Sequence, residues 1–228
     1  MKRILLAVLA WSLFTEGLFA QAGPVSPTRF AAAIKAFEDL DQVAPPPRNS
    51  ILFIGSSIFR QWTNLKEQMA PLPVFNRAFG GSRTADVLYY VDRVVLPYAP
   101  KLIVYYCGSN DVTAGLGPDG IAKGFFDFVE RVHAKNPGTR LLYVSILRAP
   151  QKMDSWDKVD EANRLVREYC ARDKRLGFID ANPAVFDGEG KPRMDLYLAD
   201  RLHYKEPAYD GFTAIIKPEV ERIWRELK

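Results

Sequence analysis

Short apolar runs alternate with longer mixed segments from residue 51 to the end of the chain. The runs contain three to six residues each and hardly any polar positions. Such continuous hydrophobicity is typical of strands that are covered on both faces, as in a parallel sheet. The pattern therefore predicts five strands, at residues 51–54, 73–75, 102–107, 141–146 and 176–179.

The segments between these runs have the spacing of amphipathic helices, with an apolar residue at every third or fourth position. This spacing is found within residues 87–95, 121–132, 159–169 and 212–227. Strands that alternate with helices predict an α/β fold with a doubly wound parallel sheet and right-handed crossovers. An earlier amphipathic stretch, residues 27–44, predicts a short helix, which the Pro-rich sequence APPPRNS then ends.

The start of the chain differs from the rest. Lys2 and Arg3 precede an apolar run of eleven residues, which is shorter than the roughly 20 residues that span a bilayer. Ala20 and Ala22 then form the small-x-small pattern that signal peptidases cut. We therefore expect residues 1–22 to be a secretory signal and the protein to be exported, either periplasmic or secreted, without a membrane span after cleavage.

Length and composition are those of one globular domain. The chain has 228 residues, of which 48% are hydrophobic, and its formal charge of +4 comes without any run of Lys or Arg. We therefore expect no nucleic-acid partner. Cys107 and Cys170 both lie in apolar patterns, which favours two buried free thiols. The alternative is that they form a disulfide. Residues 23–50 are expected to form the lead-in helix and linker, and residues 51–228 the main domain.

Ligands of a doubly wound sheet bind beyond the carboxyl ends of its strands, so the residues after each apolar run are the most informative. Four short segments occupy these positions. They are GSS at 55–57, AFGGS at 78–82, GSND at 108–111 and SILRAP at 145–150.

A serine nucleophile needs a base, and the chain contains only two histidines. His133 lies near the end of an amphipathic segment, where a cation interacts favourably with the helix terminus, so we interpret it as a surface residue. His203 lies in a loop-like stretch with Asp200 three residues earlier, and a turn can bring that carboxylate to the imidazole Nδ1. The alternative is that Asp200 caps the last helix beside an exposed histidine.

Two glycine-containing segments could supply hydrogen bonds to an anion. Gly108 permits a tight turn from which Asn110 can project its amide, although an ordinary Asx turn has the same sequence. The GGS at 80–82 could expose backbone N–H groups or be a flexible loop. Nucleotide-binding glycine motifs are absent from the sequence, and the spacing of the histidines does not favour a metal hydrolase.

Taken together and in this order, these segments resemble the SGNH (GDSL-type) hydrolase superfamily of serine esterases and lipases. All four blocks of that family have a counterpart between about residue 51 and about residue 212. The resemblance implies a flavodoxin-like three-layer α/β/α sandwich with a five-stranded parallel sheet. It also implies no metal or organic cofactor.

The resemblance assigns a role to each matching residue. Ser57 would be the nucleophile, His203 the general base and Asp200 the residue that orients it. The oxyanion hole would consist of the N–H groups of Ser57 and Gly81 and the side-chain amide of Asn110, with Gly80 as the alternative to Gly81. One departure is visible, because Ser56 stands where the family has the aspartate of its G-D-S block.

The expected activity is hydrolysis of a small-molecule or carbohydrate ester through an acyl-enzyme, with short-chain acyl or acetyl groups favoured by the expected export. A lysophospholipase or thioesterase of the same family is an alternative. A non-catalytic carbohydrate-binding module on the same fold is another, because a fold alone does not establish a function. Trp62, Met153, Trp156 and Tyr204 could line a substrate pocket or be ordinary core residues.

Overall fold

The computed structural model describes residues 28–228. The segment expected to be a secretory signal, residues 1–22, and the first part of the lead-in lie outside the described residues. The lead-in helix α1 spans Ala31–Val43, within the predicted range 27–44, and the Pro-rich stretch follows it. From residue 28 onward, no helix combines the length and the apolar character that crossing a bilayer requires.

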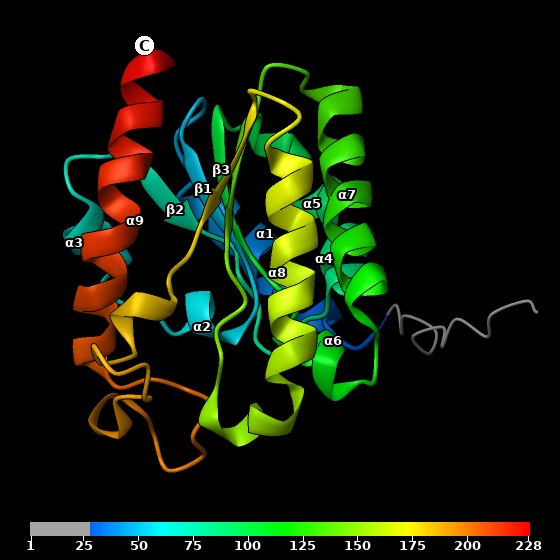
Figure 1. The fold of residues 1–228 in the computed structure, drawn as a ribbon. Coiled ribbons are helices and arrows are strands. Elements are labelled where there is room, and N and C mark those ends of the chain that lie inside the picture. Colours follow the sequence, from blue (N-terminus) through cyan, green and yellow to red (C-terminus); the bar gives the residue numbers. More distant parts are fainter. Residues whose placement is uncertain (1–27) are drawn as a thin grey trace, which may run out of the picture.

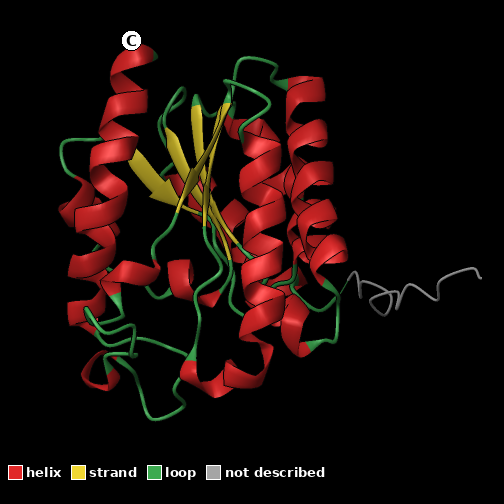
Figure 2. Ribbon diagram, viewed as in Figure 1, coloured by secondary structure: helices red, strands yellow, loops and turns green. Residues whose placement is uncertain are grey.

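Five parallel strands form one sheet in the order β2-β1-β3-β4-β5 (Figures 1 and 2). Ile51 of β1 lies opposite Val74 of β2 on one side and Leu102 of β3 on the other. The chain therefore winds first to one side of β1 and then to the other, which makes the ends of β1 and β3 the topological switch point. The strands span β1 Ile51–Gly55, β2 Val74–Asn76, β3 Leu102–Tyr106, β4 Arg140–Val144 and β5 Leu176–Ile179.

Helices cover both faces of this sheet, which confirms the predicted three-layer α/β/α architecture (Figure 1). Helices α1, α4, α5, α7 and α8 pack on one face, and α2, α3 and α9 pack on the other. The helices after α1 are α2 Ser57–Arg60, α3 Leu65–Met69, α4 Thr84–Tyr89, α5 Val91–Val94, α6 Ser109–Thr113, α7 Pro118–Lys135, α8 Trp156–Cys170 and α9 Glu206–Glu226. Short 3₁₀ turns span Leu96–Tyr98, Pro150–Ser155, Asn182–Ala184 and Met194–Leu196.

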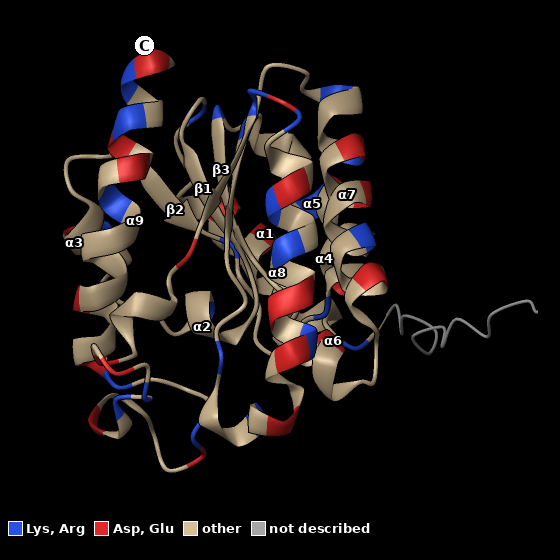
Figure 3. Ribbon diagram, in the orientation of Figure 1, with Lys and Arg blue, Asp and Glu red and all other residues tan. Residues whose placement is uncertain are grey.

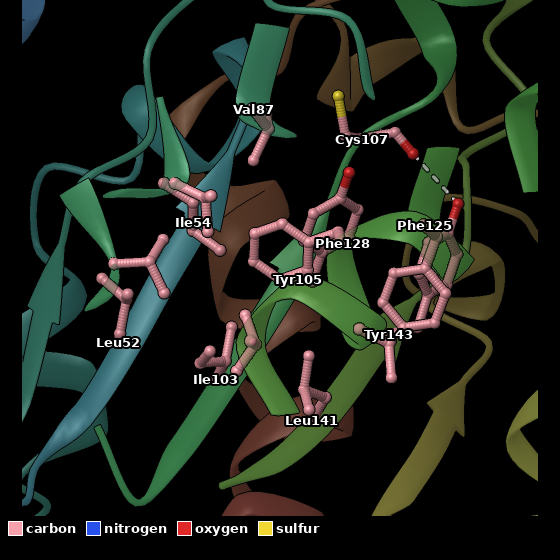
Figure 4. Close-up of a cluster of buried hydrophobic side chains, with 14 of the residues drawn as sticks. Leu52, Ile54, Val87, Ile103, Tyr105, Cys107, Phe125, Phe128, Leu141 and Tyr143 are labelled. Atoms are coloured by element: carbon pink, nitrogen blue, oxygen red, sulfur yellow. Dashed lines mark hydrogen bonds between the residues drawn. The ribbon is translucent and has the colours of Figure 1, made fainter. Parts of the chain in front are cut away.

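Alternating strand residues belong to two separate cores, one on each side of the sheet. Leu52, Ile54, Ile103, Tyr105, Leu141 and Tyr143 pack under α7 and α8, together with Phe125 and Phe128 (Figure 4). Phe53, Val104, Tyr106, Leu142 and Val144 pack under α9 on the opposite face. Burial on both faces explains why the strands read as continuous apolar runs in the sequence.

The predicted helices differ from the observed ones mainly at their ends. The pattern at residues 87–95 is divided between α4 and α5, because Tyr90 leaves the helical conformation at ψ 5°. The last helix begins at Glu206, before the predicted range. Both cysteines are buried and free, as the apolar pattern around them favours. Trp62 and Tyr204 are core residues, with 2% and 4% of their surface exposed.

Charged residues lie mainly on the outer surfaces of the helices, whereas the strands are nearly free of them (Figure 3). Several of these charges form pairs one helical turn apart, such as Lys123 with Asp127 in α7 and Arg164 with Glu168 in α8. Exposed pairs of this kind contribute about 0.3–0.5 kcal/mol each. The charges are therefore chiefly a solvated surface, in agreement with the absence of a basic run.

Candidate active site

The first strand ends in a turn that requires glycine. Gly55 has a φ of +142°, and a Cβ at this position would lie 1.7 Å from the carbonyl oxygen of Tyr106 in β3. The N–H of Ser56 donates to that same oxygen at 3.0 Å. The missing side chain therefore allows β1 to end against β3 and to continue directly into α2.

The two hydroxyls after this turn have different surroundings. Ser56 is buried, with 1% of its surface exposed, at the position before α2. Ser57 is the first residue of α2 and is partly exposed. Its Oγ lies 2.9 Å from His203 Nε2. Ser57 is thus the hydroxyl that reaches a base.

The loop before α9 brings His203 and Asp200 to Ser57 across 146 residues of sequence. Asp200 Oδ2 lies 2.6 Å from His203 Nδ1, and Asp200 Oδ1 accepts the N–H groups of Leu202 and His203 at 3.0 and 2.9 Å. Arg201, between them, has a left-handed φ of +56°. This conformation turns the loop so that the carboxylate faces its own histidine.

Electrostatics favour an ionised Asp200. Partial burial raises the pKa of this carboxyl, but the hydrogen bonds from His203 and from the backbone N–H groups of His203 and Leu202 outweigh it and lower the pKa to about 2. An ionised carboxylate accepts the Nδ1 hydrogen of the imidazole. That arrangement leaves Nε2 with a lone pair directed at the Ser57 hydroxyl.

The predicted oxyanion donors lie at the same edge of the sheet. The Ser57 N–H is at the first position of α2, and the Gly80 and Gly81 N–H groups are in the loop after β2. Within residues 28–228, none of these three N–H groups has a hydrogen-bond acceptor. Asn110, in α6 after β3, donates one amide hydrogen to the Ser82 carbonyl at 3.0 Å, and its Nδ2 carries a second hydrogen.

Ser82 links these segments, and sequence reasoning gave it no role. It is fully buried, and its hydroxyl donates to the Gly55 carbonyl at 3.1 Å. Its own carbonyl accepts the Asn110 amide and the Cys107 thiol. Ser82 therefore connects the end of β1, the glycine loop and the segment after β3. Its place in the GGS segment was a signal that it lies at the site, but its partners are not readable from sequence.

Asp111, the last residue of the GSND block, is buried beneath the loops that carry the proposed oxyanion donors. It is buried, with 1% of its surface exposed, and it accepts the Thr84 hydroxyl at 2.7 Å and the Thr84 N–H at 3.1 Å. Burial raises the pKa of Asp111 to about 6, in spite of the hydrogen bonds from Thr84, which lower it. Lys152 lies beside Ser109, two residues earlier, and donates to the Ser109 carbonyl and hydroxyl, both at 2.7 Å.

The remaining candidates lie elsewhere. His133, in the last turn of α7, has its Nε2 3.0 Å from the Thr139 carbonyl, just before β4, and so lies at the amino ends of the strands. Trp156 donates its indole N–H to the Ala149 carbonyl and packs edge-on against Phe186. Met153 is 55% exposed. Over residues 28–228, no group of three or more His, Cys, Asp or Glu residues is arranged to hold a metal ion.

Comparison with known proteins identifies a family whose sequence pattern this chain matches. Residues 53–210 match the GDSL-like lipase/acylhydrolase family. The chain is 28% identical over 165 residues to platelet-activating factor acetylhydrolase IB subunit alpha1 of Homo sapiens, with 70% of each chain covered.

Solved structures show the same fold. A GDSL-like lipase from Bacteroides thetaiotaomicron is 20% identical, with a TM-score of 0.68 over 83% of this chain and 98% of that one. A carbohydrate esterase family 3 protein from Talaromyces cellulolyticus is 15% identical, with a TM-score of 0.61 over 78% of this chain and 99% of that one.

Proposed function

Since this chain belongs to the GDSL-like lipase/acylhydrolase family and is a carboxylic ester hydrolase, we propose that it acts through Ser57, His203 and Asp200 by way of an acyl-enzyme. The observation that carries the proposal is the continuous line of hydrogen bonds from Ser57 Oγ through the His203 ring to Asp200. A hydroxyl becomes a nucleophile at neutral pH when a neighbouring base takes its proton, and this line supplies that base.

In the first half of the reaction, His203 Nε2 takes the Ser57 proton as Oγ attacks the ester carbonyl carbon. The carbonyl oxygen becomes an oxyanion, which accepts hydrogen bonds from the N–H groups of Ser57 and Gly81 and from the Asn110 amide. The bond to the leaving alkoxy oxygen then breaks, and the proton on His203 passes to that oxygen. The products of this half are the free alcohol and an ester on Ser57.

In the second half, water takes the place of the alcohol. His203 accepts a proton from the water as it attacks the acyl-enzyme, and the same three donors hold the second oxyanion. Collapse returns the proton to Ser57 Oγ and releases the carboxylic acid. Asp200 stays ionised throughout, because its role is to orient the imidazole and to stabilise the imidazolium that forms in each half.

We propose short-chain acyl esters as the substrates, acetyl esters of carbohydrates among them. Three observations support this choice. The human relative is an acetylhydrolase and a structural neighbour is a carbohydrate esterase, and the cavity beside Gly81 and Asn110 measures only about 290 Å³. Pockets for drug-sized ligands measure about 300–1,000 Å³, so this cavity, at the lower end of that range, suits a small substituent.

An ester panel tests the proposal with a variant and a matched control. Ser57→Ala is expected to lower kcat by at least about 10³-fold toward p-nitrophenyl acetate and acetylated sugars, because the nucleophile is lost. Ser56→Ala changes the adjacent buried hydroxyl and is expected to keep its activity. A fluorophosphonate probe should label the wild type and Ser56→Ala but not Ser57→Ala. Full activity in Ser57→Ala would overturn the proposal.

The same panel separates the alternative substrates. Lysophospholipids and acyl thioesters are included beside the short esters, and a higher kcat/KM for either class would replace the proposed one. The absence of labelling and of hydrolysis in the wild type would instead favour a non-catalytic binding module.

We also propose that the protein is exported, on the strength of the basic and apolar pattern in residues 1–22. Expression of the full chain in a bacterial host, followed by fractionation and sequencing of the mature N-terminus, tests this. Cleavage after Ala20 or Ala22 in the exported fraction is the expected result. An intact Met1 on cytoplasmic protein would contradict it.

A further inference from the structure

A small cavity lies directly beside the proposed oxyanion donors. Six residues line it, namely Arg29, Gly81, Arg83, Asn110, Thr113 and Ala114, and its volume is about 290 Å³. Arg29 comes from the lead-in segment before α1 and donates to the Gly81 carbonyl at 3.0 Å. The cavity therefore shares two residues with the proposed oxyanion hole and has two guanidinium groups in its wall.

Among the described residues, 28–228, one carboxylate forms ion pairs with these two arginines. Asp86 Oδ2 lies 3.8 Å from Arg29 Nη1 and 3.6 Å from Arg83 Nε, and the Asp86 side chain is fully buried. The Arg83 side chain is 14% exposed, and its buried Nε has no hydrogen-bond acceptor within residues 28–228. Two cations and one anion thus meet at the wall, where Asp86 Oδ1 also has no hydrogen-bond donor within residues 28–228.

The other charged groups near the cavity leave its net charge positive. Asp111 adds a carboxylate behind the wall, and Lys152 adds an ammonium group beside Ser109, the residue before Asn110. The two carboxylates are buried, with at most 1% of either residue exposed. The Arg29 side chain, in contrast, is 45% exposed. A ligand that enters the cavity therefore meets positive charge first, with the negative charges shielded beneath it.

The position of Arg29 is fixed by packing. The Phe30 ring lies edge-on to Phe79 in the glycine loop, with ring centroids 5.0 Å apart, and the Arg29 guanidinium lies 4.7 Å from the Phe30 ring centroid. Phe30 is 8% exposed, so the lead-in is anchored at this point. The guanidinium is therefore held at the loop that carries Gly81.

We propose that this cavity is a subsite for a carboxylate or phosphate group carried by the substrate, held by Arg29 and Arg83 while the ester carbonyl occupies the oxyanion hole. The inference rests on the proposed function, because it assigns the cavity to the same reaction. Guanidinium groups bind carboxylate and phosphate oxygens through paired, charge-assisted hydrogen bonds. The small volume places the anion within a few bonds of the scissile carbonyl.

Matched esters test the subsite in the wild-type enzyme. One pair carries the charge on the acyl side, monoethyl succinate against ethyl levulinate, and the other carries it on the alcohol side, glycerol monoacetate 3-phosphate against glycerol monoacetate. In at least one pair, the anionic ester is expected to have a kcat/KM at least about fivefold higher than the neutral ester, since a charge-assisted contact contributes that much or more. The pair with the preference identifies which part of the ester enters the cavity.

Variants then assign the preference to the two arginines. Arg29→Gln and Arg83→Gln should each bring the ratio of the two kcat/KM values close to one, and the ratio cancels any loss that both esters share. Arg29→Lys retains a cation and should retain part of the preference. Arg93→Gln is the matched control, because Arg93 pairs with Glu38 on the surface of α5 and does not line the cavity. Raising the salt concentration should also lower the wild-type ratio, because salt screens a partly exposed charge.

A wild-type ratio of one or less in both pairs would overturn the inference, as would a ratio that is unchanged in both glutamine variants. The same measurements distinguish failure of the subsite from failure of the proposed function. If Ser57→Ala removes hydrolysis of the neutral esters while the ratio is one, the enzyme acts as proposed and only the subsite is wrong. If the wild type hydrolyses no ester at all, both are wrong.

Discussion

Asp111 offers a quantitative test of how burial at the edge of the site affects stability. Its carboxylate is almost completely buried. Oδ1 accepts the Thr84 hydroxyl, and the Thr84 N–H is shared between Oδ1 at 3.1 Å and Oδ2 at 3.2 Å. Asp111→Asn keeps an oxygen at the Oδ1 position, puts an NH2 group in place of Oδ2 and removes the charge. The substitution therefore measures the free-energy cost of the buried charge with little change in shape.

The size of the cost follows from the pKa. Burial, partly offset by the Thr84 hydrogen bonds, raises the pKa of Asp111 from 3.8 to about 6. Each pKa unit corresponds to about 1.4 kcal/mol, so the ionised carboxylate costs the folded state about 3 kcal/mol at pH 8. Because the folded pKa is the higher one, the folded state takes up a proton as the pH falls through about 6, whereas the unfolded chain does so only near 3.8. The stability that depends on this group is therefore lost as the pH rises through 6.

Urea denaturation at pH 8 and pH 4.5 checks this reasoning. Asp111→Asn is expected to raise the free energy of unfolding by about 3 kcal/mol at pH 8 and by about 1 kcal/mol at pH 4.5, because at pH 4.5 the folded carboxyl is already neutral. Asp154→Asn, at an exposed aspartate, should show no such pH dependence. A gain for Asp111→Asn that is equal at the two pH values, or a loss at pH 8, would refute the argument.

Three other substitutions test the geometry of the site. Asn110→Ala should lower kcat by about 10²–10³-fold with little change in KM, because it removes one oxyanion donor, and steady-state kinetics with p-nitrophenyl acetate will measure the split. Gly55→Ala should cost more than about 4 kcal/mol of stability or prevent folding, since its Cβ would overlap the Tyr106 carbonyl; a melting temperature close to that of the wild type would contradict this. Arg201→Val should lower the free energy of unfolding by about 1–2 kcal/mol and also lower kcat/KM, because a β-branched residue disfavours the left-handed conformation. Arg201→Gly should preserve kcat/KM, because glycine adopts that conformation readily. Equal kcat/KM in the two Arg201 variants would argue against a requirement for that conformation.

The sequence predicted the fold because a buried parallel sheet has a strong pattern. All five strands are confirmed to within two residues at each end, since both faces of each strand contact a core. The pattern could not locate the break at Tyr90, because apolar residues continue at helical spacing on both sides of it. Helix ends depend on local backbone conformation, which periodicity does not record.

The residues of the site could be predicted only in part from the sequence. The rule that ligands bind at the carboxyl ends of the strands selected the segments that contain Ser57, Gly81 and Asn110, and the sheet order brings these segments to one edge. The family resemblance then assigned the individual residues. The family resemblance predicted that His203 pairs with Ser57, and His203 Nε2 lies within hydrogen-bond distance of Ser57 Oγ. Ser82 and Arg29 were not identified, because each acts through a contact with a backbone carbonyl distant in sequence. Such contacts leave no pattern along the chain.

The hydrogen bonds at this edge also have a consistent polarity. The carbonyls of Gly55, Gly81 and Ser82 are each occupied by a protein donor, respectively the Ser82 hydroxyl, Arg29 and the Asn110 amide. The N–H groups of Ser57 and Gly81, in contrast, have no acceptor within residues 28–228. Free N–H donors beside three occupied carbonyls are suited to stabilise negative charge. The loops are therefore organised for an oxyanion before any substrate binds, with Ser82 and Arg29 holding backbone carbonyls and Asn110 both holding one and offering its second amide hydrogen to the oxyanion.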